Sequence, residues 1–468
     1  MRLSLYIIIG LIFLSLVACS RSADISSAAN NFPKVILIIG DGMDDQQISI
    51  ARNYLAGSHG LLAMDTMQYR GAIRVQSVSE ADPAVPVYVT GSAASAAAIA
   101  TGIISSGQRI STFPQTDTDA VTIMELANDA GIGTGIVTTA SVTDATPASF
   151  MAHVSYRQCQ GPENMARNNA RNPRGSYECS GDYKRNGGKG SIAEQIAAGT
   201  VDIVLGGGKE YFDQVAEGES DTQVLQLARS NGYEVITKRS ELQDLPRDTP
   251  ILGLFAPGLM PPMLRGNGAS NIPAADRLDG SASLPEPYAC QENPEFADLP
   301  RVVEMTKSAI SHLESHGSFM LVIENESTDE HVHARQPCGH IGAVAQIDET
   351  LRFVLQYAET HPELLVIVTA DHGHAAQLIS EQRTNSSPGH TARLITTDGS
   401  VMGINYGTSR SGQREGHTGV QVPILASGPG TEHWPIFMPQ TEVFHIARKH
   451  LGLNESLSEA IDVEPTTP

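Results

Sequence analysis

Short apolar runs rich in β-branched residues recur along this chain of 468 residues, and longer helical patterns separate them. The runs are residues 35–39, 136–139, 201–205, 319–323, 365–369 and 422–425. Runs that are apolar at nearly every position are typical of strands buried on both faces. Helical patterns such as residues 302–313 and 343–358 lie between them. The sequence therefore predicts an α/β fold in which a large, mostly parallel central sheet is sandwiched between helices.

The charge balance limits the partners of the chain. Lys and Arg number 31 and Asp and Glu number 52, so the net charge is −21. A nucleic acid needs clustered basic residues, and we therefore expect no nucleic acid as a specific partner. An anionic substrate can still bind an acidic protein where bound cations reverse the local charge.

The N-terminal segment predicts export. Residues 1–18 begin with a positive charge and continue as an apolar stretch too short to span a membrane, as in a signal peptide. Residues 16–19, Leu-Val-Ala-Cys, resemble the bacterial lipoprotein processing box, which implies a lipid anchor on Cys19. The alternative is an ordinary signal peptide with an incidental cysteine. Residues 19–32 are composed like a flexible tether. Ser20 in place of Asp favours the outer membrane, so we expect a lipid-anchored protein on a periplasmic face.

Four further cysteines fit an oxidising compartment. They are Cys159, Cys179, Cys290 and Cys338, and they allow three pairings into two disulfides. Pairing in sequence order closes the shortest loops. A cysteine-based zinc site is disfavoured because no Cys-x-x-Cys spacing occurs.

The apolar pattern predicts one domain. It covers residues 33–455, with loop insertions near 160–190 and 257–300, and is followed by a C-terminal tail over 456–468. The two insertions are rich in turn-forming residues and break the strand–helix alternation.

Residues with metal-binding side chains follow the predicted strands. They are Asp41, Asp144, Thr146, Glu324, Asp329, His333, Asp371, His372 and, late in the chain, His417. A lone Asp after a strand is more often a turn or helix cap, Asp329 with His333 could be a solvated helix face, and Asp371-His372 could be a loop with a surface His. Ligands in open α/β sheets, however, bind beyond the carboxyl ends of the strands. Mixed Asp and His ligands indicate Zn²⁺, and Asp, Glu and Thr oxygens indicate Mg²⁺.

Ser92 is the candidate nucleophile. The Ala-rich stretch up to Ala100 predicts a helix that places Ser92 at its N-terminus, where N–H groups and the helix dipole favour an anion. A simple N-cap is the alternative for Ser92. Ser95 and Thr90 are rivals by residue type, but Ser95 lies inside the predicted helix and Thr90 precedes it.

Several separated motifs resemble those of the alkaline phosphatases. They are residues 89–96, Val-Thr-Gly-Ser-Ala-Ala-Ser-Ala, and the segments 324–339, 369–372 and 415–419. The resemblance implies three metal sites: a first zinc on Asp329, His333 and His417, a second zinc on Asp41, Asp371 and His372, and a magnesium on Asp41, Asp144, Thr146 and Glu324.

The same resemblance implies an activity. Small phosphate monoesters would be hydrolysed to alcohol and inorganic phosphate through a phosphoserine at Ser92, while Arg157 clamps the phosphoryl group. A homodimer and the disulfides 159–179 and 290–338 are also implied.

Two residues depart from the family pattern. Gly91 stands where many bacterial members carry an Asp that braces the Arg, and Glu330 stands where relatives often carry Lys or His. A carboxylate at 330 would repel phosphate and favour less charged esters, so a phosphodiesterase of the same superfamily is an alternative. A lipid-anchored protein that binds phosphate or metal is the alternative without catalysis. His331, His340 and His374 are interpreted as structural or solvated.

Overall fold

The computed structural model describes residues 32–168, 176–199, 201–266, 275–276, 284–381, 389–409 and 413–453. The predicted signal peptide, Cys19, the tether up to residue 31 and the tail over 456–468 lie outside the described residues, as do parts of both loop insertions. The described residues from Phe32 onward belong to one compact unit.

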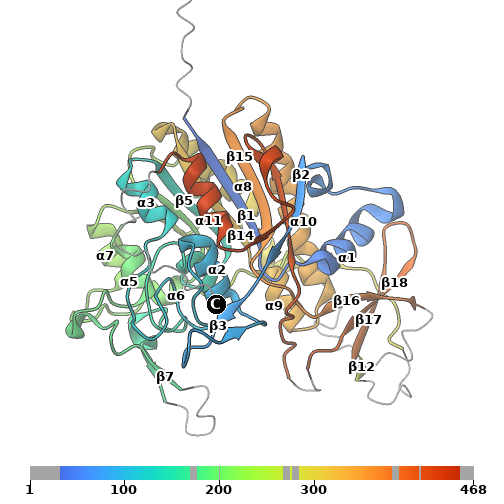
Figure 1. Cartoon of the computed structure of the whole chain (residues 1–468), viewed down its shortest axis with the longest axis horizontal. Coiled ribbons are helices and arrows are strands. Elements are labelled where there is room, and N and C mark those ends of the chain that lie inside the picture. The colour runs from blue at the N-terminus through green and yellow to red at the C-terminus, as the bar shows by residue number, and fades with distance from the viewer. Residues whose placement is uncertain are drawn as a thin grey trace, which may run out of the picture. The chain divides into compact units, whose positions relative to one another are not determined.

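Among the described residues, the central sheet has ten strands in the order β20-β2-β19-β15-β1-β14-β5-β8-β10-β9 (Figure 1). Their bounds, in that order, are Phe437–Pro439, Tyr69–Arg74, Val422–Ser427, Leu364–Ala370, Lys34–Gly40, Phe319–Asn325, Gly133–Ser141, Ile203–Gly207, Ile251–Leu254 and Glu234–Ile236. Neighbouring strands from β15 to β9 are parallel, whereas β19 is antiparallel to β15 and β2. The predicted large, mostly parallel sheet is confirmed.

The apolar runs predict where the strands lie, but they do not predict whether a strand is parallel or antiparallel to its neighbours. Five of the six runs lie within strands, and the run at 201–205 is displaced, because the strand there covers Ile203–Gly207. Strand β19 is antiparallel although five of its six residues are buried. An antiparallel strand covered on both faces is as apolar as a parallel one, so the pattern indicates burial and leaves direction open.

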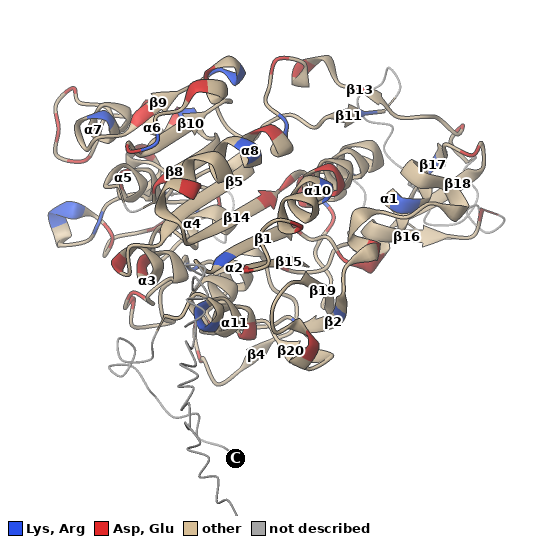
Figure 2. Cartoon of the chain, turned by 90° about the horizontal axis from the view of Figure 1, so that it is seen from above, with Lys and Arg blue, Asp and Glu red and all other residues tan. Residues whose placement is uncertain are grey.

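Helices cover both faces of the central sheet (Figures 1 and 2). Helices α8 and α10 pack on one face, and α2, α3, α4 and α11 lie on the other. The helix bounds are α1 Asp45–Ala56, α2 Ser92–Thr101, α3 Ile123–Asp129, α4 Ala145–Ala148, α5 Ile192–Ala197, α6 Lys209–Phe212, α7 Val224–Ser230, α8 Val302–Leu313, α9 Ser327–His333, α10 Pro337–Ala358 and α11 Glu442–His450. The predicted helix 302–313 has the observed bounds. Helix α10 begins six residues before the predicted 343, because Pro337 is well placed in a first turn.

Short strands form smaller sheets beside the central one. The bounds are β3 Ser77–Val78 with β4 Pro86–Val87, β6 Ala166–Arg167 with β7 Tyr177–Glu178, β11 Leu264–Arg265 with β13 Gln291–Glu292, and the set β12 Ala275–Asp276, β17 His390–Ile395, β18 Val401–Tyr406 and β16 Ala376–Ile379. The last set lies next to α1 (Figure 1).

Two disulfides pair the cysteines in sequence order. Cys159 is bonded to Cys179, and Cys290 to Cys338 in the first turn of α10. The pairing with the shortest loops is therefore confirmed.

Acidic residues are spread over the helices on both faces of the sheet and do not form one run (Figure 2). Within the part of the chain that the structure describes, no helix has the length and apolar character needed to cross a membrane.

Candidate active site and metal centre

The register of the sheet brings three carboxylates together. The last residue of β1 is in register with the last residues of β14 and β15. Asp41 and Asp371 directly follow β1 and β15, and Glu324 is the penultimate residue of β14. All three are at most 3% exposed. The carboxyl end of the sheet thus holds a buried acidic cluster, as the sequence predicts.

Helix α9, which follows β14, adds Asp329 and His333 to this end of the sheet. Asp329 Oδ2 lies 3.1 Å from His333 Nε2, and Asp329 Oδ1 lies 3.2 Å from His417 Nε2 and 3.0 Å from His374 Nε2. Ligand atoms of these four residues lie within 4.8 Å of one another, close enough for one cation. The structure therefore brings together the three predicted ligands of the first zinc and adds His374.

The histidines differ in which ring nitrogen carries the proton, and the hydrogen bond at Nδ1 of each ring determines this. Nδ1 of His333 and of His417 each meets a backbone carbonyl oxygen, which only accepts, so the proton lies on Nδ1 and the Nε2 lone pair is free for a cation. His372 is similar, with Nδ1 3.3 Å from a carbonyl oxygen. His374 is the reverse, because its Nδ1 accepts a backbone N–H over 2.8 Å. Burial lowers the pKa of His374 to about 4, so this ring is neutral and its proton lies on Nε2, 3.0 Å from Asp329 Oδ1.

A second group of ligands adjoins the first. His372 Nε2 lies 3.2 Å from Asp41 Oδ1 and 3.5 Å from Asp371 Oδ2, and 4.0 Å from Asp329 Oδ1. Asp371 Oδ1 is occupied by two backbone N–H groups, each at 2.9 Å, which fix the orientation of the carboxylate. The predicted ligands of the second zinc are therefore neighbours, and Asp329 lies between the two groups.

Ser92 lies beside this second group. It is the first residue of α2 and 3% exposed. Its Oγ is 3.2 Å from His372 Nε2 and 3.5 Å from Asp41 Oδ1. Ser95, the rival one turn later, directs its Oγ to Asp371 Oδ2 over 3.2 Å and also donates to carbonyl oxygens of its own helix.

Burial and mutual repulsion act strongly on the pKa values of these carboxylates. Burial and the charge of Asp329 raise the pKa of Asp41 to about 7. Burial and the charge of Asp41 raise the pKa of Asp371 to about 7 and that of Glu324 well above its usual value. Burial acts in the same direction on Asp329, but the three surrounding histidines, His333, His374 and His417, outweigh it and hold the pKa well below normal. Acids crowded in this way fit divalent cations, which offset their repulsion.

The predicted magnesium ligands differ in the contacts that they make. Thr146 is 1% exposed, and its Oγ1 has no hydrogen-bond partner among the described residues, as expected of an oxygen reserved for a cation. Glu324 accepts a hydrogen bond from Thr138. Asp144 instead caps α4, and its Oδ1 accepts from Arg157 Nη2 over 2.8 Å. The oxygen donors suit Mg²⁺, but Asp144 is shared with Arg157.

Glu330 is paired with a basic residue that the sequence analysis missed. Arg414 Nη1 donates to Glu330 Oε1 over 2.6 Å, and its Nη2 binds Oε2. A two-bond ion pair of this kind largely cancels the charge of Glu330. Arg414 directly precedes the Glu-Gly-His segment in sequence, and that position beside a predicted ligand is the signal that could have identified it. The same signal applies to His374, two residues after His372.

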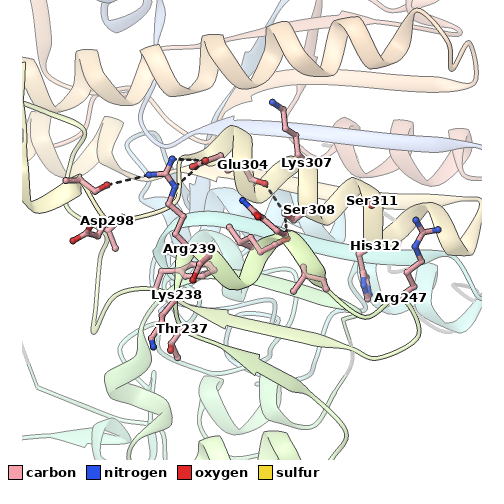
Figure 3. A pocket seen from close by; sticks show the side chains of 17 residues that line it. Thr237, Lys238, Arg239, Arg247, Asp298, Glu304, Lys307, Ser308, Ser311 and His312 are labelled. Carbon is pink, nitrogen blue, oxygen red and sulfur yellow. Dashed lines mark hydrogen bonds and ion pairs between the residues drawn. The ribbon is translucent and has the colours of Figure 1, made fainter.

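A separate cavity of about 1110 Å³ lies between the short helix Arg239–Asp244 and α8 (Figure 3). Arg239 turns toward α8 there, with Nη2 2.8 Å from Glu304 Oε1. None of the predicted site residues lines this cavity. The predicted site residues at the carboxyl end of the sheet are therefore separate from this cavity.

Comparisons with known proteins agree with this geometry. A model of the alkaline phosphatase family matches residues 32–413. The chain is 38% identical over 458 residues to streptomycin-6-phosphate phosphatase of Streptomyces griseus, covering 95% of this chain and 97% of the relative. It is 36% identical over 427 residues to the alkaline phosphatase of Escherichia coli K12, and the match covers 90% of this chain and 86% of the relative.

Solved structures support the fold. Alkaline phosphatase from the Antarctic bacterium TAB5 has a TM-score of 0.63 at 23% identity, covering 90% of this chain and 99% of that one. Alkaline phosphatase from Thermus thermophilus has the same TM-score at 20% identity, and the match covers 90% of this chain and 92% of that one. A family match over most of the chain and two phosphatase relatives above 30% identity show that the chain belongs to the alkaline phosphatase family and is a phosphomonoester hydrolase.

Proposed function

We propose that the protein is an exported alkaline phosphatase that hydrolyses small phosphate monoesters through a phosphoserine at Ser92, with two zinc ions and one magnesium ion. The observation that carries the proposal is the position of Ser92 Oγ at the start of α2, within 3.5 Å of both His372 Nε2 and Asp41 Oδ1. A hydroxyl placed at a helix N-terminus beside candidate metal ligands suits attack on an anionic phosphoryl group.

Ser92 and Arg157 have different roles in the proposed reaction. Ser92 Oγ attacks phosphorus and gives up its proton to solvent. The bond between phosphorus and the alcohol oxygen breaks as the phosphoserine forms, and that oxygen takes a proton from water to leave as the alcohol. Arg157 binds the non-bridging oxygens and keeps them in line. Water then cleaves the bond between phosphorus and Ser92 Oγ, which regenerates the serine and releases phosphate. When bound, the cations supply Lewis-acid stabilisation of the negative charge that develops on oxygen.

The ligand sets follow from the donor atoms. Asp329, His333 and His417 would hold the first zinc, and Asp41, Asp371 and His372 the second, because each set offers three protein ligands and leaves a position open. The oxygens of Asp41, Asp144, Thr146 and Glu324 would hold magnesium.

Monoesters are favoured over diesters by the pairing of Glu330. The argument for less charged esters depends on an unpaired carboxylate at that position, and Arg414 binds both oxygens of this carboxylate. A chromogenic monoester should therefore be hydrolysed much faster than the matching diester. A relative at 38% identity is named for streptomycin-6-phosphate, which belongs in the substrate panel.

The setting of the enzyme is part of the proposal. Two disulfides suit an oxidising compartment, and the segment around Cys19 suits a lipid anchor on a periplasmic face. We infer a homodimer from the resemblance to the family.

Ser92→Ala tests the mechanism, with Ser95→Ala as the matched control on the same helix. We expect Ser92→Ala to lower kcat by about a thousandfold or more, because the nucleophile is lost. Mass spectrometry of acid-quenched reactions should find the phosphoryl group on the Ser92 peptide in the wild type and in Ser95→Ala. Retained turnover in Ser92→Ala, or a label on another residue, would refute the phosphoserine at Ser92.

A further inference from the structure

The proposed ligands of the first zinc come from two segments that are far apart in sequence. Asp329 and His333 lie on α9, whereas His417 lies in a loop 84 residues after His333. Two hydrogen bonds join the segments directly. The backbone N–H of Glu415 donates to the carbonyl oxygen of His333 over 3.0 Å, and His333 Nδ1 donates to the carbonyl oxygen of Glu415. The position of Glu415 therefore determines how the loop of His417 lies against α9.

The side chain of Glu415 is held as firmly as its backbone. It is 0% exposed, and its Oε1 accepts a hydrogen bond from Arg335 Nε over 2.7 Å. Its Oε2 accepts from the backbone N–H groups of Thr408 and Ser409 over 2.9 and 3.0 Å, and from Thr408 Oγ1 over 2.7 Å. Both carboxylate oxygens are thus satisfied and the buried charge is compensated, so this carboxylate can anchor the loop that leads to His417.

Arg335 connects the same loop to α9. It stands two residues after His333, and its backbone N–H donates to the carbonyl oxygen of Val332 over 3.0 Å, which closes the last turn of the helix. Its φ of 59° lies in the left-handed region, which is unfavourable for a residue with a Cβ. Its guanidinium binds Glu415 and also donates from Nη2 to the carbonyl oxygen of Gln413. Arg335 thus adopts a costly backbone conformation where its side chain spans the two ligand-bearing segments.

We propose that Arg335 and Glu415 are positioning residues for the first zinc, because their ion pair holds the loop of His417 against α9. Contacts that orient a metal-binding histidine from its far side strengthen metal binding, and the loss of one typically weakens it roughly tenfold to a hundredfold. Among the described residues, Glu415 makes no hydrogen bond to the proposed ligands of the second zinc, so the effect belongs to the first zinc. This inference rests on the proposed function, because that function supplies the zinc ions.

Zinc binding to the full chain tests the inference. The protein is stripped of metal and, with Mg²⁺ present throughout, titrated with zinc against a colorimetric chelator, while native mass spectrometry counts the bound ions. The test variants are Arg335→Ala and Glu415→Gln. The control is Arg52→Ala, which breaks an ion pair of 2.6 Å with Asp65 that makes no hydrogen bond to the proposed ligands among the described residues.

The expected result is selective. Each test variant should bind one zinc about tenfold or more weakly and the other within about twofold of the wild type, and Arg52→Ala should stay within about twofold for both. Excess zinc should recover most of the kcat that Arg335→Ala loses, which it would not do for a protein that fails to fold. Arg335→Lys keeps the charge without the planar fork and should have an intermediate zinc affinity.

Three results would overturn the inference. Wild-type zinc affinity in both test variants would make the ion pair purely structural, and this can occur while the wild type binds two zinc ions and is phosphorylated at Ser92. An equal loss of both zinc ions would indicate a general loosening of the site. A wild type that binds no zinc would overturn the inference together with the proposed metal set. Circular dichroism establishes that Arg335→Ala is folded. If it is not, Arg335→Gly replaces it with the same expected result, because Gly adopts a φ of 59° without strain.

Discussion

Among the described residues, Arg157 has one carboxylate hydrogen-bond partner, Asp144. Gly91 occupies the position where many bacterial relatives place a bracing Asp. Its φ of −121° suits any residue, and an added Cβ would come no closer than 3.6 Å to His417. We expect Gly91→Asp to fold normally and to lower the inhibition constant of inorganic phosphate about threefold to tenfold, as one charge-assisted hydrogen bond of ~1 kcal/mol would. Gly91→Ala fills the same space without the carboxylate and should leave that constant unchanged, and an unchanged or higher value in Gly91→Asp would contradict the prediction.

Arg414 masks the charge of Glu330. Arg414→Ala should leave that carboxylate unpaired and raise KM for an anionic monoester about threefold to tenfold at low salt, less at high salt. The double variant Arg414→Ala/Glu330→Gln should return KM close to the wild-type value, because the repelling charge is gone. Steady-state kinetics at two ionic strengths measure this, and a double variant no better than Arg414→Ala would show that the ion pair does not act through charge.

The motifs identify the candidate ligands but not their partners. Asp41, Asp371 and Glu324 could be placed from sequence because each stands at the end of an apolar run, and a parallel register aligns such ends. The Glu330–Arg414 pair joins residues 84 positions apart, and no local pattern indicates such a contact. The role of His374 depends on a backbone N–H at its Nδ1, which only three-dimensional geometry shows.

At the scale of elements, α9 depends on its neighbours. A helix of seven residues is unstable alone, yet it carries Asp329 and His333. It packs against α10, whose first turn is fixed by the Cys290–Cys338 disulfide.

Removing each disulfide should therefore have different effects. The separations of 48 and 20 residues correspond to about 4 kcal/mol for Cys290–Cys338 and about 3 kcal/mol for Cys159–Cys179 in the chain-entropy model. We expect paired Ser substitutions to lower the free energy of unfolding in urea by these amounts. Zinc release to a colorimetric chelator should accelerate only in the variant that lacks the Cys290–Cys338 disulfide. Equal release from both variants would show that the position of α9 does not depend on this disulfide.

The positions of the central strands could be predicted from the sequence because burial alone determines them. The apolar runs locate the central strands, but they leave the direction of β19 open, since both directions are equally buried in this sheet. The start of α10 was missed because Pro337 and Cys338 were assigned to a metal segment, although a Pro begins a helix well.

At the scale of the whole molecule, the metal site affects the stability of the sheet. The pKa values of Asp41 and Asp371 are raised to about 7 without metal, against an unfolded value of about 4. Between these values the folded chain holds protons that the unfolded chain has released, so the stability of the metal-free protein falls as pH rises. Metal binding needs the charged forms and reverses this trend.

We therefore expect the chelated protein to melt at a lower temperature at about pH 8 than at about pH 5, and the metal-loaded protein to lack this decrease. Calorimetric melting with chelator or with zinc and magnesium measures both curves. Asp41→Asn, which cannot ionise, should reduce the slope of the chelated protein. A chelated protein that became more stable across this range would contradict the assigned shifts.

Helix α2 also matters beyond Ser92, the proposed nucleophile at its start. All ten of its residues are buried, and most are alanines enclosed on every side. A larger side chain anywhere along it would displace its neighbours and, with them, the end that bears Ser92. In a saturation library selected for activity, this helix should tolerate almost no replacements. A map of tolerated substitutions would then mark the whole helix as if each residue took part in chemistry, although only its first residue is the proposed nucleophile.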